Sequence, residues 1–371
     1  MGQYLEYRKI KEPSLKGRYI QHSQIGRLIH GLGNSFTVVA AGSSVMGLPI
    51  DYIKIGQGSF KVLLWSQMHG NESTTTKALF DLLNLLSTSD PLAEKIKASC
   101  TLTVIPMLNP DGANRYTRVN ANGVDLNRDA QNRSQPESRI LRAVYDHVKP
   151  DFCFNLHDQR TIFGAGPTNK PATLSFLSPS ADTERSLTAS REKGMKLIAA
   201  VNKHMQLLIP GQVGRYDDLF NSNCVGDTFQ MLGCTTVLVE AGHFQKDYPR
   251  ERTREYVFQA LLKSLEVLAE GTLEAASTDD YFSIPENRKN FFDLLIHNVH
   301  CINDSLEKGT SIGILYEEQL QDDAIFFKPY IERSGMLYDI YGHQTYDCTD
   351  PVSVAKLRNQ PEIWTLLNLV K

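Results

Sequence analysis

The sequence predicts an α/β protein with a mixed, mostly parallel sheet covered by helices on both faces, followed by a small C-terminal α+β or β-rich appendage. Short apolar runs alternate with helical patterns along residues 60–270, which is the order that builds a sheet between helices. Several runs are apolar throughout, as expected for strands buried on both faces. A polar stretch over 271–290 then has the composition of a linker.

Six apolar runs rich in β-branched residues are the predicted strands of the main sheet. They are 36–40 (FTVVA), 50–55 (IDYIKI), 61–65 (KVLLW), 101–107 (TLTVIPM), 151–156 (DFCFNL) and 235–240 (TTVLVE). The segments between and after them space their apolar residues at the helical period. These predicted helices cover 73–86, 137–148, 191–208 and 250–269.

The C-terminal part has weaker patterns. One segment, 291–306, is predicted as a helix, and three pieces, 311–317, 324–332 and 336–342, are predicted as strands. We therefore expect two units. Residues 1–272 would form the main domain, and residues 273–371 would form the appendage.

Composition and charge limit the classes of partner. Charged residues make up 22% of the chain and the net charge is −3, which gives no basic footprint for nucleic acid or an anionic membrane surface. The N-terminal residues lack the apolar core of a secretory signal, and no apolar run reaches the length of a membrane span. The six cysteines are dispersed and form no Cys-x-x-Cys pair. We therefore expect reduced thiols and a cytoplasmic location.

Polar residues that could carry chemistry follow the predicted strands, where α/β sheets bind their ligands. They are His69, Glu72, Asn109, Asp111, His157 and Glu240. A catalytic zinc site uses three protein ligands, commonly two histidines and a carboxylate, and His69, Glu72 and His157 would supply that set. Two structural alternatives stay open: a polar turn after a buried strand for His69 and Glu72, and a backbone-bonded histidine at a strand end for His157.

Four motifs extend this hypothesis. The segments "HGNE" (69–72), "LNPDGANRYTRVNANGVDLNRD" (108–129), "NLHD" (155–158) and "VLVEAG" (237–242) occur in this order. Together they resemble the zinc metallocarboxypeptidase family typified by carboxypeptidase A, over residues 35–270. The aspartoacylase and succinylglutamate desuccinylase group is similar to this family and shares a His-x-x-Glu pair.

The resemblance implies a role for each matching position. His69, Glu72 and His157 would bind one Zn²⁺ per chain. Asp125 would accept a hydrogen bond from the other ring nitrogen of His69, which fixes the tautomer of a ligand. Glu240 would be the general base, taking a proton from the attacking water and passing it to the leaving amine.

The same resemblance assigns the substrate contacts. Asn127 and Arg128 would bind the terminal carboxylate of the substrate, which suits a planar guanidinium. Arg118 would polarise the scissile carbonyl and stabilise the oxyanion. Arg115 is a rival for that role, although its spacing fits less well.

Three positions depart from the family pattern or leave it open. Asn71 stands where the digestive enzymes have an arginine that helps bind extended peptides. Tyr216 is the nearest match to the tyrosine that covers the bound carboxylate, but its spacing to Glu240 is a few residues off. Asp227 lies in the segment matching the side-chain pocket, where it would either select a basic side chain or be structural.

These features predict a zinc-dependent hydrolase that removes a C-terminal amino acid from a peptide or peptide-like substrate. The alternative is a zinc-dependent deacylase of small N-acyl amino acids, which the C-terminal appendage favours, whereas Arg118 and the complete "NPDG" favour a peptidase. A zinc-free binding module is a third hypothesis. It would be expected to lack a ligand or the base, and all of them are present.

Overall fold

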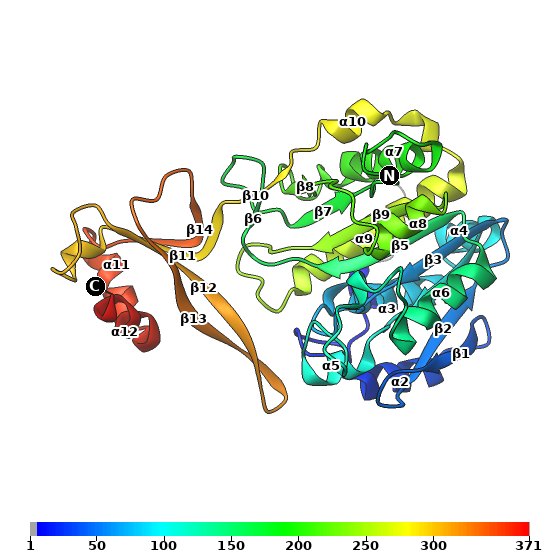
Figure 1. Cartoon of the computed structure of the whole chain (residues 1–371), viewed down its shortest axis with the longest axis horizontal. Helices are drawn as coiled ribbons and strands as arrows, with labels where there is room; N and C mark the ends of the chain where they lie inside the picture. Colours follow the sequence, from blue (N-terminus) through cyan, green and yellow to red (C-terminus); the bar gives the residue numbers. More distant parts are fainter. Residues whose placement is uncertain (1–5, 371) are drawn as a thin grey trace.

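The computed structural model describes residues 6–370 and confirms the predicted α/β class (Figure 1). Residues 1–5, part of the segment considered for a secretory signal, lie outside the described residues. The main sheet has eight strands in the order β1-β2-β4-β3-β5-β9-β7-β8. Their bounds are β1 Thr37–Ser43, β2 Pro49–Ile55, β3 Phe60–Trp65, β4 Cys100–Ile105, β5 Phe152–Asp158, β7 Leu174–Leu177, β8 Val213–Arg215 and β9 Thr235–Ala241.

The four central strands, β4, β3, β5 and β9, are mutually parallel, and antiparallel pairs occur toward both edges. The helices of this part of the chain are α1 Tyr7–Ile10, α2 His22–His30, α3 Thr74–Leu86, α4 Pro91–Ser99, α5 Pro110–Arg115, α6 Pro136–Val148, α7 Ala189–Met205, α8 Val225–Met231 and α9 Glu251–Glu270. Four of them, α3, α4, α7 and α9, cover one face, while α6 and α8 cover the other.

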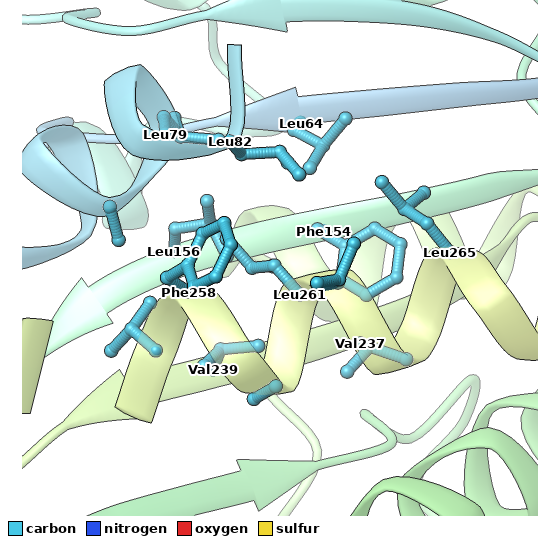
Figure 2. Packing of buried hydrophobic residues seen from close by; sticks show 14 of the residues in the cluster. Leu64, Leu79, Leu82, Phe154, Leu156, Val237, Val239, Phe258, Leu261 and Leu265 are labelled. Carbon is cyan, nitrogen blue, oxygen red and sulfur yellow. The ribbon is translucent and has the colours of Figure 1, made fainter. Parts of the chain in front are cut away.

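Alternating side chains of the central strands enter two hydrophobic cores. In β3, Val62 and Leu64 belong to the larger core, whereas Leu63 and Trp65 belong to the smaller one. Figure 2 shows the larger core, where Leu261 and Leu265 of α9 face the sheet. Burial of a side chain of this size contributes about 1.5–3 kcal/mol, so both cores hold the central strands in register.

The C-terminal residues form a second sheet of four strands in the order β13-β12-β11-β14. The strands are β11 Phe291–His297, β12 Ser311–Gln321, β13 Ala324–Gly335 and β14 Tyr341–Asp347, and the helices α11 Pro351–Arg358 and α12 Pro361–Leu369 pack on one face. Figure 1 shows this sheet beside the main one, with β12 and β13 forming a long hairpin. The expected β-rich C-terminal region is confirmed.

Two details of the C-terminal prediction are wrong. The predicted helix over 291–306 is strand β11 followed by the 3₁₀ turn η3, Val299–Cys301. Leu294 and Leu295 enter different clusters, so the strand is buried on both faces. Its short apolar run, interrupted by Asp293, does not distinguish a strand from a helix. The predicted strand 336–342 is also misplaced, because β14 begins only at Tyr341.

The polar stretch over 271–290 contains structure of its own. It includes the 3₁₀ turn η2 Leu273–Ala275, the helix α10 Thr278–Phe282 and the strand β10 Asn287–Lys289, which pairs with β6 Phe163–Ala165. The Tyr281 side chain is fully buried in the larger core. No helix within residues 6–370 is both long and apolar enough to cross a membrane.

Candidate active site

The loop after β3 brings His69 and Glu72 to the carboxyl end of the sheet. Gly70 is required there, because a Cβ at this position would lie 2.0 Å from the backbone carbon of Gly112. The amide of Glu72 donates to the carbonyl of His69 at 3.1 Å, which closes the turn directly before α3. The sequence motif is thus a tight turn whose two polar side chains are both buried.

Asn109 and Asp111 brace the surrounding loops, although their positions after a strand made them candidates for the site. The amide group of Asn109 donates to the Met68 carbonyl at 3.1 Å and accepts from the Gly112 amide at 2.9 Å. Asp111 accepts hydrogen bonds from the hydroxyl of Ser44 and the amide of Met46. Neither side chain lines the cavity described below. Their expected place in the site is therefore corrected to a supporting role.

The three predicted metal ligands converge on one point. The carboxylate of Glu72 lies 2.9 Å from Nδ1 of His69 and, through its other oxygen, 2.9 Å from Nδ1 of His157. The two Nδ1 atoms are 3.1 Å apart. His69 and His157 are each 2% exposed. In the described part of the chain, these three residues are the cluster whose donor atoms could hold a metal ion.

The hydrogen bonds of this cluster fit a bound cation. Nε2 of His69 lies 3.0 Å from Asp125 Oδ1, and a neutral imidazole that donates there carries a lone pair on Nδ1. That lone pair faces both the carboxylate of Glu72 and the ring nitrogen of His157. Several acceptors around one point are stabilised by a cation, and two imidazoles with one carboxylate form a common zinc donor set.

Neighbouring charges act on the carboxylates of this cluster. Burial favours the neutral form of Glu72, but His69 and His157 outweigh it and hold the pKa of this carboxyl well below its ordinary value. Burial also favours the neutral form of Asp125, but the hydrogen bond from His69 and the charge of Arg118 outweigh it and lower the pKa of this carboxyl. Both groups are therefore ionised acceptors.

Glu240 is brought to the cluster by strand pairing. Its Cα is the register partner of His157 in the adjacent parallel strands β5 and β9. The carboxylate has no hydrogen-bond or ion-pair partner among residues 6–370, and it faces the same cavity as His69 and Glu72. Burial, followed by the negative charges of Glu72 and Asp158, raises the pKa of this carboxyl well above its ordinary value.

Asp158, the residue after His157, has a different environment. Its carboxylate accepts hydrogen bonds from the amide and the hydroxyl of Thr74, at 3.2 and 2.6 Å, at the start of α3. Its backbone amide donates to Glu72 at 3.1 Å. Asp158 thereby holds the first turn of α3 and orients Glu72.

The two arginines that could stabilise the oxyanion, Arg118 and Arg115, differ in their position relative to the cavity. Arg118 donates to Glu72 at 3.1 Å and to Asp125 at 3.1 Å, and it lines the cavity. Tyr116 turns the chain out of α5 with a positive φ of 55°. Arg115, the last residue of α5, is exposed and does not line the cavity. The geometry therefore favours Arg118.

Asn127 and Arg128 lie together at another side of the cavity. Asn127 accepts a hydrogen bond from the amide of Val225 at 2.9 Å, which anchors it to the first turn of α8. Arg128 donates to the Asn127 carbonyl at 2.6 Å and to the sulfur of Cys224 at 3.1 Å. Within the described residues its guanidinium has no carboxylate partner, so its charge is available to a ligand.

Tyr216 and Asp227 have different positions relative to the cavity. Tyr216 follows β8 and lines the cavity, with its ring 5.4 Å from that of Phe163. Asp227 is buried in α8 and does not line the cavity, and its burial raises the pKa of the carboxyl to about 6. The position of Asp227 gives no support to its selecting a basic substrate side chain.

All of these lining residues border one cavity of about 740 Å³. This is within the usual size of small-ligand sites, about 300–1,000 Å³.

Comparison with known proteins shows which family the chain resembles. Residues 29–175 match the family model described as zinc carboxypeptidase. The resemblance to the zinc carboxypeptidase family is confirmed. Carboxypeptidase SOL1 of Arabidopsis thaliana is 36% identical over 137 residues, which are 31% of this chain and 28% of that protein. Cytosolic carboxypeptidase 1 of Gallus gallus is 36% identical over 89 residues, which are 24% of this chain and 7% of that protein.

Solved structures show the same fold. A metallo-carboxypeptidase from Burkholderia cenocepacia aligns with a TM-score of 0.56 and 18% identity, over 68% of this chain and 70% of that one. A carboxypeptidase A from Shewanella denitrificans, named as putative, aligns with a TM-score of 0.55 and 19% identity, over 67% and 69%.

Sequence reasoning missed several residues that line the cavity. Arg18 precedes the main sheet, Tyr248 and Arg250 follow β9, and Asp293 and Glu318 come from the C-terminal sheet. Arg250 donates to the carbonyl of Gln159, just after β5, and to the carbonyl of Ala241, the last residue of β9. The only sequence signal was the nearness of Tyr248 and Arg250 to a strand end, because the other three depend on contacts between distant segments.

Proposed function

We propose that this chain is a zinc-dependent carboxypeptidase that hydrolyses the last peptide bond of a peptide or peptide-like substrate. The observation that carries the proposal is the convergence of His69, Glu72 and His157 in one cavity with Glu240, a carboxylate that has no partner among residues 6–370. The match of residues 29–175 to the zinc carboxypeptidase model supports it.

His69, Glu72 and His157 would hold the metal, and Asp125 would fix the ring orientation of His69. Bound there, zinc would lower the pKa of a water to near neutrality and polarise the scissile carbonyl. The amide of Asp158 keeps the Glu72 carboxylate in place. These contacts position the ligands before any substrate arrives.

Substrate binding would begin at the carboxylate. Arg128, whose charge has no acidic partner in the described chain, would pair with it, and Asn127 would donate from its side-chain amide. Tyr216 would cover the bound group from the same cavity. In this arrangement the scissile bond would lie at the histidine cluster, which lines the same cavity.

Glu240 would move the proton. Its unpaired carboxylate would take a proton from the attacking water, and the raised pKa suits a group that must afterwards give the proton to the leaving amine. Arg118 would donate to the oxygen of the reacting carbonyl as negative charge develops there. Its bonds to Glu72 and Asp125 hold the guanidinium ready.

Deacylation of small N-acyl amino acids is the second candidate, and one observation favours it. Residues of the C-terminal sheet, among them Tyr316 and Glu318, line the same cavity as the cluster, which suits a small substrate. Parallel assays of short peptides and N-acyl amino acids with zinc-loaded protein separate the two activities. Release of a C-terminal residue supports the peptidase, whereas loss of the acyl group alone supports the deacylase.

The division of the chain remains part of this proposal. Residues 1–272 would be the catalytic domain and residues 273–371 the appendage. The packing of α10 and the pairing of β10 with β6 keep the chain against the main domain until about residue 290. We also propose a cytoplasmic location, supported by the free thiols and by the similarity to proteins named cytosolic carboxypeptidases.

The zinc site makes a first prediction. The purified protein should bind about one zinc ion per chain, because two histidines and one carboxylate make a three-ligand site. His157→Ala should lose most of this zinc at limiting chelator concentrations, as measured by elemental analysis. His147→Ala, which changes an exposed histidine of α6, is the control and should retain the metal. Full occupancy in His157→Ala would remove His157 from the ligand set.

The two arginines make a second prediction. Arg128→Ala should mainly raise KM, because a hydrogen bond to a charged group contributes about 1.5–3 kcal/mol, or about 10–150-fold. Arg118→Ala should mainly lower kcat, by about 10²–10³-fold, as expected for loss of an oxyanion donor. Steady-state kinetics of a short peptide measures both.

Arg115→Ala is the matched control, since this arginine is exposed and outside the cavity. The zinc content of Arg118→Ala must be measured as well, because Arg118 contacts the ligand Glu72. If Arg115→Ala abolished turnover and Arg118→Ala did not change kcat, the two arginines would have been assigned in the wrong order.

A further inference from the structure

The C-terminal sheet forms one wall of the cavity that holds the histidine cluster. Asp293 of β11, Tyr316 and Glu318 of β12, and Tyr330 of β13 all line it. The β12–β13 hairpin extends from the four-stranded sheet in Figure 1. A strand that lines the cavity and is fixed to the main domain at several points limits the room for a substrate.

The base of the hairpin is fixed through Asp293. This buried carboxylate accepts from the hydroxyl of Tyr248 at 2.8 Å, the hydroxyl of Thr161 at 3.2 Å and the amide of Tyr316 at 2.9 Å. The ring of Tyr248 also lies 5.4 Å from that of Tyr316. The start of the hairpin is therefore joined to the loops that follow β5 and β9.

The middle of the hairpin is fixed beside the cluster. Glu318 forms an ion pair with Arg18 at 3.0 Å and accepts from the hydroxyl of Tyr116. The carbonyl of Arg18 accepts from the hydroxyl of Ser73, the residue after Glu72. At the tip, Gln21 donates to Asp323 at 3.1 Å. The hairpin thus runs from the strand ends to the N-terminal segment.

These contacts define where a substrate can extend. Arg128 follows Asp125, whose carboxylate contacts His69 of the cluster. Glu318 pairs with Arg18, and the carbonyl of Arg18 accepts from Ser73, the residue after Glu72. With the substrate carboxylate at Arg128 and the scissile bond at the cluster, the remaining residues of the substrate would have to fit in the rest of the same cavity, which Tyr316 and Glu318 of β12 line. The cavity of about 740 Å³ has the size of a site for a small ligand, which suits a short peptide.

We infer that the β12–β13 hairpin, which lines the cavity of the histidine cluster, restricts this enzyme to short peptides. The inference rests on the proposed carboxypeptidase function. The hairpin acts by steric exclusion of longer chains, a form of selection against the wrong substrate. It requires no chemistry beyond the hydrolysis already proposed.

The test is kcat/KM for a series of peptides that share their last two residues and increase in length to about ten. For zinc-loaded wild-type protein, kcat/KM should fall by about tenfold or more once the peptide exceeds the length that the cavity holds. A variant assigns this loss to the hairpin: residues 316–329 are replaced by Asn-Gly, a two-residue turn that joins the register partners Leu315 and Tyr330.

The variant also carries Arg18→Met, so that no buried guanidinium is left without its carboxylate. It should cleave long and short peptides with similar kcat/KM. The control replaces only the tip residues Asp322 and Asp323 with Asn-Gly and should retain the wild-type length preference. A hairpin variant that folds, binds zinc and keeps the wild-type preference would overturn the inference.

A binding measurement with the full chain covers the case in which the hairpin variant does not fold. Calorimetry with zinc-loaded Glu240→Gln should show affinity falling by about tenfold or more for the long peptides. Equal binding and equal cleavage at all lengths would contradict the length limit and leave the peptidase intact. Absence of cleavage at every length would instead contradict the proposed function, and the inference with it.

Discussion

Glu240→Gln is expected to lower kcat by about 10²–10⁴-fold, the usual contribution of a general base. Glutamine keeps the size of the side chain but does not accept a proton, and Glu240 is outside the three-residue donor set. The zinc content and the unfolding midpoint should therefore remain close to those of the wild type. Since the same group would also protonate the leaving amine, we expect the upper end of the range.

Kinetics with a short peptide, together with elemental analysis, checks this result. A variant that kept more than about a tenth of the wild-type kcat would lose less than the expected 10²–10⁴-fold, and Glu240 would not be the base. Asp158 would then be the next carboxylate to test, although its bonds to Thr74 give it a structural role.

Asp81→Asn is expected to destabilise the fold by about 3–5 kcal/mol, the usual effect of removing one partner of a buried ion pair. Asp81 and Arg254 are both 0% exposed, and two atoms of the guanidinium lie 2.5 and 2.7 Å from the carboxylate. Arg254 also donates to the carbonyls of Glu12 and Leu15. The pair therefore joins α3, α9 and the N-terminal segment.

Urea unfolding of the wild type and of Asp81→Asn measures the difference in their free energies of unfolding. Glu270→Gln is the control, because its ion pair with Lys95 is exposed and such pairs contribute about 0–1 kcal/mol. A similar loss of stability in both variants would show that burial of the Asp81 pair has no special effect.

The sequence predicted the main sheet because its signals are local. Runs such as 61–65 and 151–156 are apolar and short, and they became β3 and β5 with small shifts of their ends. Local patterns of this kind do not predict the order of the strands in the sheet. β7 pairs with both β9 and β8 through contacts distant in sequence, and β7 and β8 are too short for a periodic pattern.

The convergence of the site followed from the strand ends and the family motifs. His69, Glu72 and His157 come together as expected, and Glu240 lies beside them because β5 and β9 are neighbours in register. The roles of these residues remain predictions. The rule that site residues follow strand ends was wrong for Asn109, whose side chain instead braces the loop after β3.

The wall formed by the C-terminal sheet was outside the reach of sequence reasoning. Glu318 lies in a segment with weak periodicity, and its partner Arg18 is 300 residues away in the chain. Contacts of this kind depend on how the two sheets dock. Their physical cause is the ion pair between Arg18 and Glu318 together with a buried carboxylate, Asp293, that accepts from both parts of the chain.

The most direct test of the proposed function is mass spectrometry of the products that zinc-loaded wild-type protein makes from one short, unblocked peptide. The proposal predicts the free C-terminal amino acid together with the peptide shortened by one residue. Neither product should form with Glu240→Gln or after removal of zinc by a chelator. Cleavage only at the N-terminus or inside the peptide, or equal C-terminal release by Glu240→Gln, would contradict the proposal.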